Sequence, residues 1–134
     1  MAEAAVEVVR AVYAAWNRAE FPGPPELLNP EIEYVNPPDA IEAGTRHGLA
    51  AFTRALKKTL EGWETWQMDV EEMSANGEDV AVIVRYRARG RASGAEIAGR
   101  ESALWTVRDG RVVRYAWFHG HADASRVMRE RAVP

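Results

Sequence analysis

Two histidines and an aspartate near the carboxyl end of the chain are the first candidates for chemistry. His119, His121 and Asp123 alternate along the sequence, so on an extended strand their side chains would point the same way. Imidazole and carboxylate groups at this spacing could hold Zn²⁺. Gly120 and a helix expected from residue 122 argue against a continued strand, and no fourth ligand is visible. We therefore expect no metal and no other cofactor, and His119 stays a candidate base because histidine titrates near neutral pH.

Cysteine is absent from the 134 residues, which excludes disulfides, thiol nucleophiles and thiolate metal sites. The amino-terminal residues contain neither a basic segment nor a long apolar one, so we expect no secretory signal. No apolar stretch approaches the roughly 20 residues of a membrane-spanning helix. These features predict a cytoplasmic protein that does not contact a membrane.

Basic residues concentrate in the carboxyl-terminal part of the chain, although the formal net charge is −3. Arg85, Arg87 and Arg89 alternate, which is typical of one face of a strand. In a hairpin that turns at Asn76-Gly77, Asp69 would lie near Arg85 on the neighbouring strand. Cross-strand ion pairs therefore explain the arginines, and without a recognition motif we expect no nucleic-acid partner.

The elements that must position these residues follow from hydrophobic periodicity. Apolar residues recur at helical spacing in two long segments, and from residue 64 the period changes to 2. The expected order is helix 2–19, helical turn 26–28, strand 32–35, loop 39–47, helix 49–63, strands 64–73, 79–90, 95–107 and 111–119, and a helical segment around 122–130. This order predicts a single α+β domain over residues 1–134, with a curved sheet around a small, mostly apolar pocket.

Four sequence segments mark this order of elements. They are Leu-Leu-Asn-Pro-Glu-Ile-Glu-Tyr at 27–34, Asn36-Pro37, Gly-Thr-Arg-His-Gly at 44–48, and Leu-Trp-Thr-Val-Arg-Asp-Gly-Arg-Val-Val at 104–113. Their order and spacing resemble the SnoaL-like group of the NTF2-like superfamily, which also includes ketosteroid isomerases, limonene epoxide hydrolases and SnoaL-type polyketide cyclases. The resemblance covers essentially the whole chain. It implies an NTF2-like cone, in which a curved antiparallel or mixed sheet packs against three helices around a central cavity, and a homodimer formed through the outer sheet face.

The resemblance also implies which residues line the cavity. On the last strand it places Arg114 and Phe118 inside. Trp66, Trp117 and His119 then belong to the outer, dimer-facing side. An aromatic lining with few polar groups suits a small, flat, largely apolar ligand. The expected ligand-binding residues are Trp16, Tyr34, Asn36, Tyr86, Trp105, Arg114 and Phe118, of which Trp105 is the expected direct contact.

Glu101 is the one carboxylate that the resemblance places inside the cavity. As a base it would need its pKa raised by apolar surroundings. Arg114 on the neighbouring strand would instead keep it ionised, and the favoured interpretation is a buried ion pair that orders the sheet. The candidate catalytic residues are therefore Glu101 and His119, each with a structural alternative, which for His119 is packing at a dimer contact.

Two well-defined mechanisms of the superfamily lack their residues here. The ketosteroid isomerase route needs a carboxylate base, and Asn36 stands at that position. The limonene-type hydrolases need an aspartate where Ala116 stands. Tyr34 and Asn36 do resemble the pair that holds water in those hydrolases, but we favour local hydrogen bonding between them.

Three classes of function remain open. The first is an isomerase-, cyclase- or hydrolase-type enzyme that acts on a small, largely apolar molecule through one pocket acid or base. The second is a non-catalytic binder of such a molecule. The third is a dimeric association module with a filled cavity.

Overall fold

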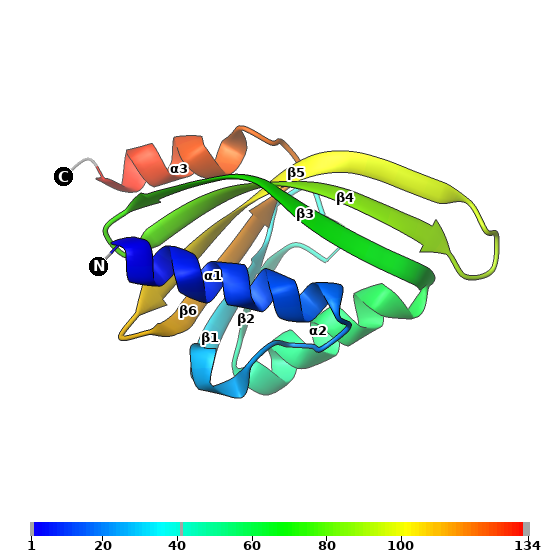
Figure 1. Ribbon diagram of the computed structural model, residues 1–134, viewed down its shortest axis with the longest axis horizontal. Helices are drawn as coiled ribbons and strands as arrows, with labels where there is room; N and C mark the ends of the chain where they lie inside the picture. Colours follow the sequence, from blue (N-terminus) through cyan, green and yellow to red (C-terminus); the bar gives the residue numbers. More distant parts are fainter. Residues whose placement is uncertain (1, 41, 133–134) are drawn as a thin grey trace.

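A mixed β-sheet that bends strongly across its width organises the chain, of which the computed structural model describes residues 2–40 and 42–132 (Figure 1). The strands of this described part are β1 (Leu28–Asn36), β2 (Gly44–His47), β3 (Trp63–Asn76), β4 (Asp79–Gly90), β5 (Glu96–Arg108) and β6 (Arg111–Phe118). They lie in the order β2-β1-β6-β5-β4-β3. β1 runs parallel to β6, and the other neighbouring pairs are antiparallel.

The meander from β3 to β6 turns where the sequence predicts. Gly77 and Gly110 have positive φ angles of 63° and 77°, which glycine adopts without the steric cost that a Cβ atom brings. Each of these glycines follows a small polar residue, Asn76 or Asp109, and both pairs are typical of tight hairpins.

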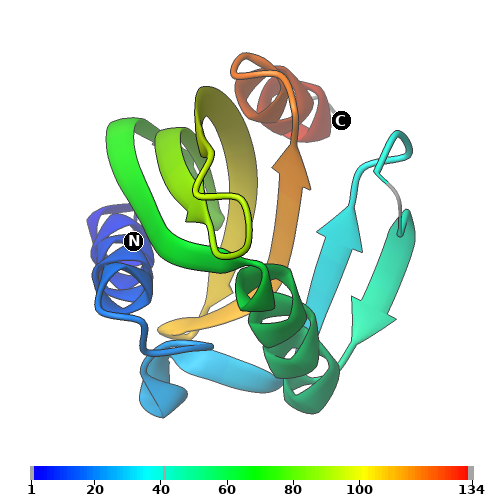
Figure 2. The same ribbon diagram turned by 90° about the vertical axis from the view of Figure 1, so that its right-hand side faces the viewer.

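The helices are α1 (Ala2–Asn17), α2 (Leu49–Glu61) and α3 (Asp123–Ala132), with a 3-10 turn η1 (Pro25–Leu27) before β1. α1 and α2 lie against the concave face of the sheet, and α3 packs on the opposite face (Figure 2). There Ala124 and Met128 of α3 contact Ala81 and Leu104. The predicted α+β cone is confirmed, although α3 lies outside the cavity. Of the helices in the described residues, none is long and apolar enough to cross a membrane.

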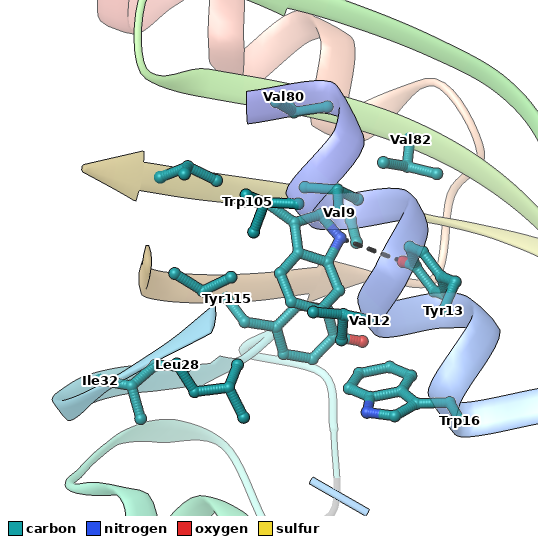
Figure 3. Packing of buried hydrophobic residues seen from close by; sticks show 14 of the residues in the cluster. Val9, Val12, Tyr13, Trp16, Leu28, Ile32, Val80, Val82, Trp105 and Tyr115 are labelled. Carbon is teal, nitrogen blue, oxygen red and sulfur yellow. Dashed lines mark hydrogen bonds between the residues drawn. The ribbon is translucent and has the colours of Figure 1, made fainter. Parts of the chain in front are cut away.

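The main core lies on the concave face of the sheet. Val80 and Val82 of β4 and Trp105 of β5 are fully buried together with Val9 and Val12 of α1 (Figure 3). Inward residues alternate along each strand, and those of α1 recur at helical spacing. Because burial of this apolar surface drives folding, it also fixes which strand face looks towards the cavity.

The first two strands differ from the prediction. The segment 39–47 was expected to be a loop, but residues Gly44–His47 form β2 and pair with β1 from Glu33↔His47 to Asn36↔Gly44. Most side chains of β2 are exposed, so this strand lacks the apolar alternation that would reveal it. β1 also begins at Leu28, four residues before the expected start.

The arginines of β4 lie on the outer sheet face and form the expected cross-strand ion pairs. Asp69 lies opposite Arg85 in the register of β3 and β4. Arg85 Nε lies 3.1 Å from a Glu71 carboxylate oxygen, and Arg87 Nη2 lies 3.3 Å from Asp69 Oδ2. The predicted pairing is confirmed, with each arginine reaching a carboxylate on the neighbouring strand.

Candidate functional site

A cavity of about 120 Å³ lies between α2 and the concave face of the sheet. Of the eleven described residues that line it, six are aromatic. An apolar cavity of roughly 150 Å³ is enough to hold benzene, so this cavity has the size of about one ring. The lining residues are Trp16, Phe21, Tyr34, Leu56, Thr59, Leu60, Trp66, Met68, Glu101, Tyr115 and Trp117.

Glu101 is the one carboxylate among the described residues that line the cavity. It lies on β5 opposite Val84 of β4, and therefore shares the inward face of Trp105. Burial raises the pKa of Glu101 to about 7, because the ionised form loses its hydration in apolar surroundings. No hydrogen bond or ion pair joins its carboxylate to another side chain in the described part of the chain. Near neutral pH this group therefore exists in both protonation states.

The prediction of an ion pair between Glu101 and Arg114 is wrong. Arg114 lies opposite Thr106 and on the other face of the sheet, where its Nε is 3.8 Å from Glu33 Oε2. Burial lowers the pKa of Arg114. Within the described residues its Nη1 atom is buried without a hydrogen-bond partner. Arg114 therefore does not hold Glu101 in the ionised form.

The inward and outward faces of β6 are the reverse of the expectation. Tyr115 lies opposite Trp105, and Trp117 lies opposite Ala103. Residues that oppose each other on neighbouring strands share one face, so Tyr115 and Trp117 point into the cavity. Phe118 instead packs with the cluster beneath α3. The predicted inward positions of Arg114 and Phe118 are therefore wrong.

A shift in strand register is the physical cause of this reversal. Val107 pairs with Val112, but Thr106 pairs with Arg114, so β6 carries one extra residue at this point. Such a β-bulge moves every following residue to the other face. Without it, Trp105 would lie opposite Arg114. Trp66 was also expected on the outer face, and it too lines the cavity.

Two tyrosine side chains share the cavity with Glu101. The rings of Tyr34 and Tyr115 stack with their centroids 5.7 Å apart and an interplanar angle of 6°. Burial raises the pKa of Tyr34 and raises the pKa of Tyr115 well above its usual value, and the nearby charge of Glu101 adds to both shifts. Both hydroxyls are therefore protonated, and each keeps a hydrogen that it can donate.

Trp105 and Tyr86 support the cavity wall from behind. Trp105 is completely buried, and its indole N–H donates a hydrogen bond of 3.1 Å to the Tyr13 hydroxyl (Figure 3). Tyr86 stacks on Trp66, with 6.5 Å between ring centroids. Neither Trp105 nor Tyr86 is among the described lining residues, so the geometry does not favour the direct ligand contact expected of them.

Asn36 and His119 lie in a wider open cleft of about 560 Å³ that shares Tyr34 and Trp117 with the cavity. Asn36 Oδ1 accepts a hydrogen bond of 2.6 Å from Trp117 Nε1, and its amide donates one of 2.8 Å to the Glu42 carbonyl. The local satisfaction expected for Asn36 thus involves Trp117 and Glu42, whereas Tyr34 was the expected partner.

His119 lies in the open cleft that adjoins the cavity, whereas the sequence placed it on the outer sheet face. Its Nε2 is 3.6 Å from Asp39 Oδ1, and its ring meets the Trp117 ring edge-on at 4.8 Å. β6 ends at Phe118, so strand alternation does not continue through His121. In the described residues no three His, Asp or Glu side chains gather to hold a metal ion.

Several lining residues carry a signal that is visible in the sequence only once the register is known. The stripe of α2 that includes Leu56 and Leu60 indicates a buried helix face, but it does not indicate whether that face meets a core or a cavity. Phe21 lies in the segment after α1, outside any periodic pattern. The strand register that pairs Trp105 with Tyr115 decides which aromatic residues of β6 line the cavity.

Comparisons with known proteins found similar chains and similar folds. An uncharacterized protein of Mycobacterium tuberculosis is 27% identical over 124 residues, which cover 92% of this chain and 94% of that protein. Among solved structures, an NTF2-like protein of unknown function from Burkholderia pseudomallei has a TM-score of 0.76 at 21% identity, covering 92% of this chain and 95% of that one.

Two further solved structures are similar. TerC, co-crystallised with polyporic acid, has a TM-score of 0.76 at 19% identity and covers 94% of this chain and 98% of its own. A Jannaschia protein proposed to be a SnoaL-like polyketide cyclase has a TM-score of 0.71 at 19% identity, with coverages of 99% and 94%. At these identities the likeness shows the fold alone. The family model of the SnoaL-like domain matches residues 9–115, and the chain therefore belongs to the SnoaL-like domain family.

Proposed function

We propose that this SnoaL-like protein is an acid–base enzyme that moves a proton on a small, largely apolar carbonyl compound. The observation that carries the proposal is the unpaired carboxylate of Glu101 in an aromatic cavity. A general base works best when its pKa lies near the operating pH, and burial raises the pKa of Glu101 to about 7. The cavity is about the size of one ring, so the reacting part of the ligand is one ring or a group of similar size.

In the proposed step, ionised Glu101 takes a proton from the carbon next to the ligand's carbonyl group. The C–H bond breaks, an O–H bond forms on the carboxylate, and the electron pair moves onto the carbonyl oxygen as an enolate. A hydroxyl of Tyr34 or Tyr115 donates a hydrogen bond to that oxygen. When a C=C bond is conjugated with the enolate, return of the proton from Glu101 to the far carbon of the conjugated system completes an isomerisation. When the enolate carbon instead attacks a second carbonyl group, a C–C bond forms, the electron pair of that C=O bond moves onto its oxygen, and Glu101 returns the proton to this oxygen to complete a cyclisation.

Two structural neighbours indicate which compounds to test first. One structural neighbour is proposed to be a polyketide cyclase and another was crystallised with polyporic acid. Carbonyl compounds with rings are therefore reasonable first probes. We assign Trp16, Tyr34 and Tyr115 to ligand contact. His119 belongs to the cleft outside the cavity, and we propose that it is not the base.

Hydrogen–deuterium exchange at carbon tests the proposal. Cyclohex-2-enone and acetophenone are incubated with the protein in D₂O, and loss of the α-hydrogen signal is followed by ¹H NMR. The wild-type protein is expected to accelerate exchange of at least one probe, and Glu101→Gln to abolish the acceleration. Glu130→Gln, a matched change at an exposed position of α3, is the control and should leave exchange unchanged.

The same experiment separates the alternatives. Ligand binding without any exchange would indicate the non-catalytic binder. Exchange that survives in Glu101→Gln would contradict the assigned base. Absence of both binding and exchange would favour the association module.

We also retain the homodimer as a proposal, because it is expected from the family resemblance. Light scattering of the purified chain at several concentrations tests it. A mass of twice 14.9 kDa is the expected result, and the mass of a single chain would contradict it.

A further inference from the structure

The charge balance of the cavity points to a ligand that carries a positive charge. Of the described residues that line it, none is a lysine, arginine or histidine, and Glu101 is the one ionisable acid. Arg114 pairs instead with Glu33 on the opposite sheet face, and Arg100 pairs with Glu71 on the outer face. An ionised carboxylate among apolar rings without a cation is unfavourable, so a cationic ligand would supply the partner that the described residues do not.

The aromatic residues around Glu101 provide the second observation. Trp16 meets Tyr115 edge-on, with centroids 5.6 Å apart and an interplanar angle of 87°, and Tyr34 stacks on Tyr115. Trp66 and Trp117 complete the lining from β3 and β6. Rings that come from different elements and lie at different angles surround the cavity on several sides. The negative faces of such rings attract cations within about 6 Å of their centroids, tryptophan most strongly.

The cavity adjoins an open part of the surface. It shares Tyr34, Thr59 and Trp117 with the open cleft beside His119. A ligand that enters from this cleft would pass these three side chains.

From the unpaired carboxylate and the surrounding rings, we propose that the cavity binds small organic cations, namely protonated amines or quaternary ammonium compounds about the size of one ring. This inference goes beyond the proposed reaction and needs no turnover. It rests on the same cavity, and ionised Glu101 is the form that both functions use.

Among the described residues that line the cavity, Glu101 is the one whose charge changes between pH 5 and 8, and His119 lies outside it in the adjoining cleft, against the Trp117 ring. The other titratable groups that face Glu101 are the phenols of Tyr13 from α1, Tyr34 from β1 and Tyr115 from β6. Burial raises the pKa of each, and the charge of Glu101 raises them further. α2, β3 and β4 present no ionisable described residue to the cavity. A bound cation stabilises ionised Glu101, so binding at pH 6 to 7 releases a proton.

The test uses N-methylpyridinium, a permanently charged single ring, with toluene as a neutral control of the same shape. Binding is followed by the ¹⁵N-indole signals of Trp16, Trp66 and Trp117 in ¹H–¹⁵N NMR spectra at pH 5.5 and pH 8. The cation is expected to shift these signals saturably at pH 8. Only the ionised fraction of Glu101 attracts N-methylpyridinium. The apparent Kd of this cation should therefore be at least about tenfold higher at pH 5.5 than at pH 8. The Kd of toluene should differ by no more than about twofold between the two pH values.

Two variants test the roles of the carboxylate and the rings. Glu101→Gln should weaken the binding of N-methylpyridinium at pH 8 at least about tenfold. The affinity for toluene should stay within about twofold of the wild-type value. Trp66→Leu keeps an apolar wall but removes a ring face, and should therefore reduce the affinity for the cation more than the affinity for toluene. Glu130→Gln is again the matched control and should change neither.

Three results would overturn the inference. The first is that N-methylpyridinium does not shift the cavity indole signals at pH 8. The second is that it binds with equal affinity at pH 5.5 and pH 8. The third is that it binds Glu101→Gln as tightly as the wild-type protein. The pH series uses the unaltered protein and stays decisive even if a variant fails to fold. Cation binding without carbon exchange would refute only the proposed reaction, and exchange without cation binding would refute only this inference.

Discussion

Trp105 of β5 lies opposite Tyr115 of β6, and their ring centroids are 4.4 Å apart. This pairing sets the character of the site. It directs Tyr115, and two residues later Trp117, towards the same side as Glu101. It also directs Arg114 to the opposite face, away from Glu101. The carboxylate is consequently left among aromatic rings, with no cationic partner among the described residues, and both proposed functions depend on that isolation.

The first prediction concerns stability as a function of pH. Burial raises the pKa of Glu101 to about 7 from an ordinary value of 4.5, so the folded state binds more protons than the unfolded state between these values. Stability therefore falls as pH rises from about 4.5 through 7. The loss in the free energy of unfolding across this pH range is at most roughly 3 kcal/mol.

Urea unfolding of the wild-type protein and Glu101→Gln at several pH values checks this prediction. Glutamine carries no charge, so the variant should be the more stable protein at pH 8. The difference in the free energy of unfolding should shrink towards pH 5. A variant that is less stable than the wild type at pH 8 would show that the carboxylate has a stabilising partner.

A second prediction concerns the hydrogen bond between Trp105 and Tyr13. Tyr13→Phe removes the acceptor of the buried indole N–H, which lies 3.1 Å from the hydroxyl oxygen. An unsatisfied buried donor costs about 1–3 kcal/mol, and urea unfolding should detect that loss. Toluene affinity should stay nearly constant, because neither residue lines the cavity among the described residues. An unchanged free energy of unfolding would contradict the bond.

A third prediction concerns the contact between Gly99 and Tyr86. A Cβ atom added at Gly99 would lie 2.8 Å from Tyr86 Cζ, so Gly99→Ala must displace the ring that stacks on Trp66. We expect a loss of about 1–3 kcal/mol in the free energy of unfolding. A shifted indole signal of Trp66 should accompany it.

Gly62→Ala is the matched control for this change. No atom lies within 4 Å of a Cβ built at Gly62, and its φ of −80° suits alanine. This variant should be neutral or slightly stabilising. Equal effects of the two alanine substitutions would contradict the proposed packing of Tyr86.

A fourth prediction separates His119 from Glu101. His119 lies in the outer cleft beside Asp39, so His119→Ala should keep carbon exchange within about threefold of the wild-type rate. Loss of exchange in this variant, with exchange retained in Glu101→Gln, would reverse the assignment of the base.

Much of the fold could be predicted because its signals are local. The apolar stripes gave both long helices, and Asn76-Gly77 and Asp109-Gly110 gave two of the hairpin turns. β2 could not be predicted, since a short exposed strand has no periodicity of its own and depends on pairing with β1. The lining of the cavity was only partly predictable. Glu101, Trp16 and Tyr34 were placed correctly by the family resemblance, but the bulge in β6 reversed its two faces.

The bulge escaped the sequence for a physical reason. Both faces of β6 are apolar near its end, with Tyr115 and Trp117 on one side and Ala116 and Phe118 on the other. Alternation therefore does not distinguish the cavity side from the side beneath α3. Only the pairing with β5 decides between them, and that pairing shifts by one residue between Val107 and Thr106.

The central claim is that Glu101 is an unpaired carboxylate in the cavity, and a ¹³C NMR titration of its side-chain carboxyl group tests this most directly. The signal is assigned by its absence from Glu101→Gln. We predict a midpoint near pH 7, which moves to lower pH when N-methylpyridinium is bound. A midpoint at or below 4.5 in the free protein would mean that water or a cation already stabilises the ionised carboxylate, and would contradict the account.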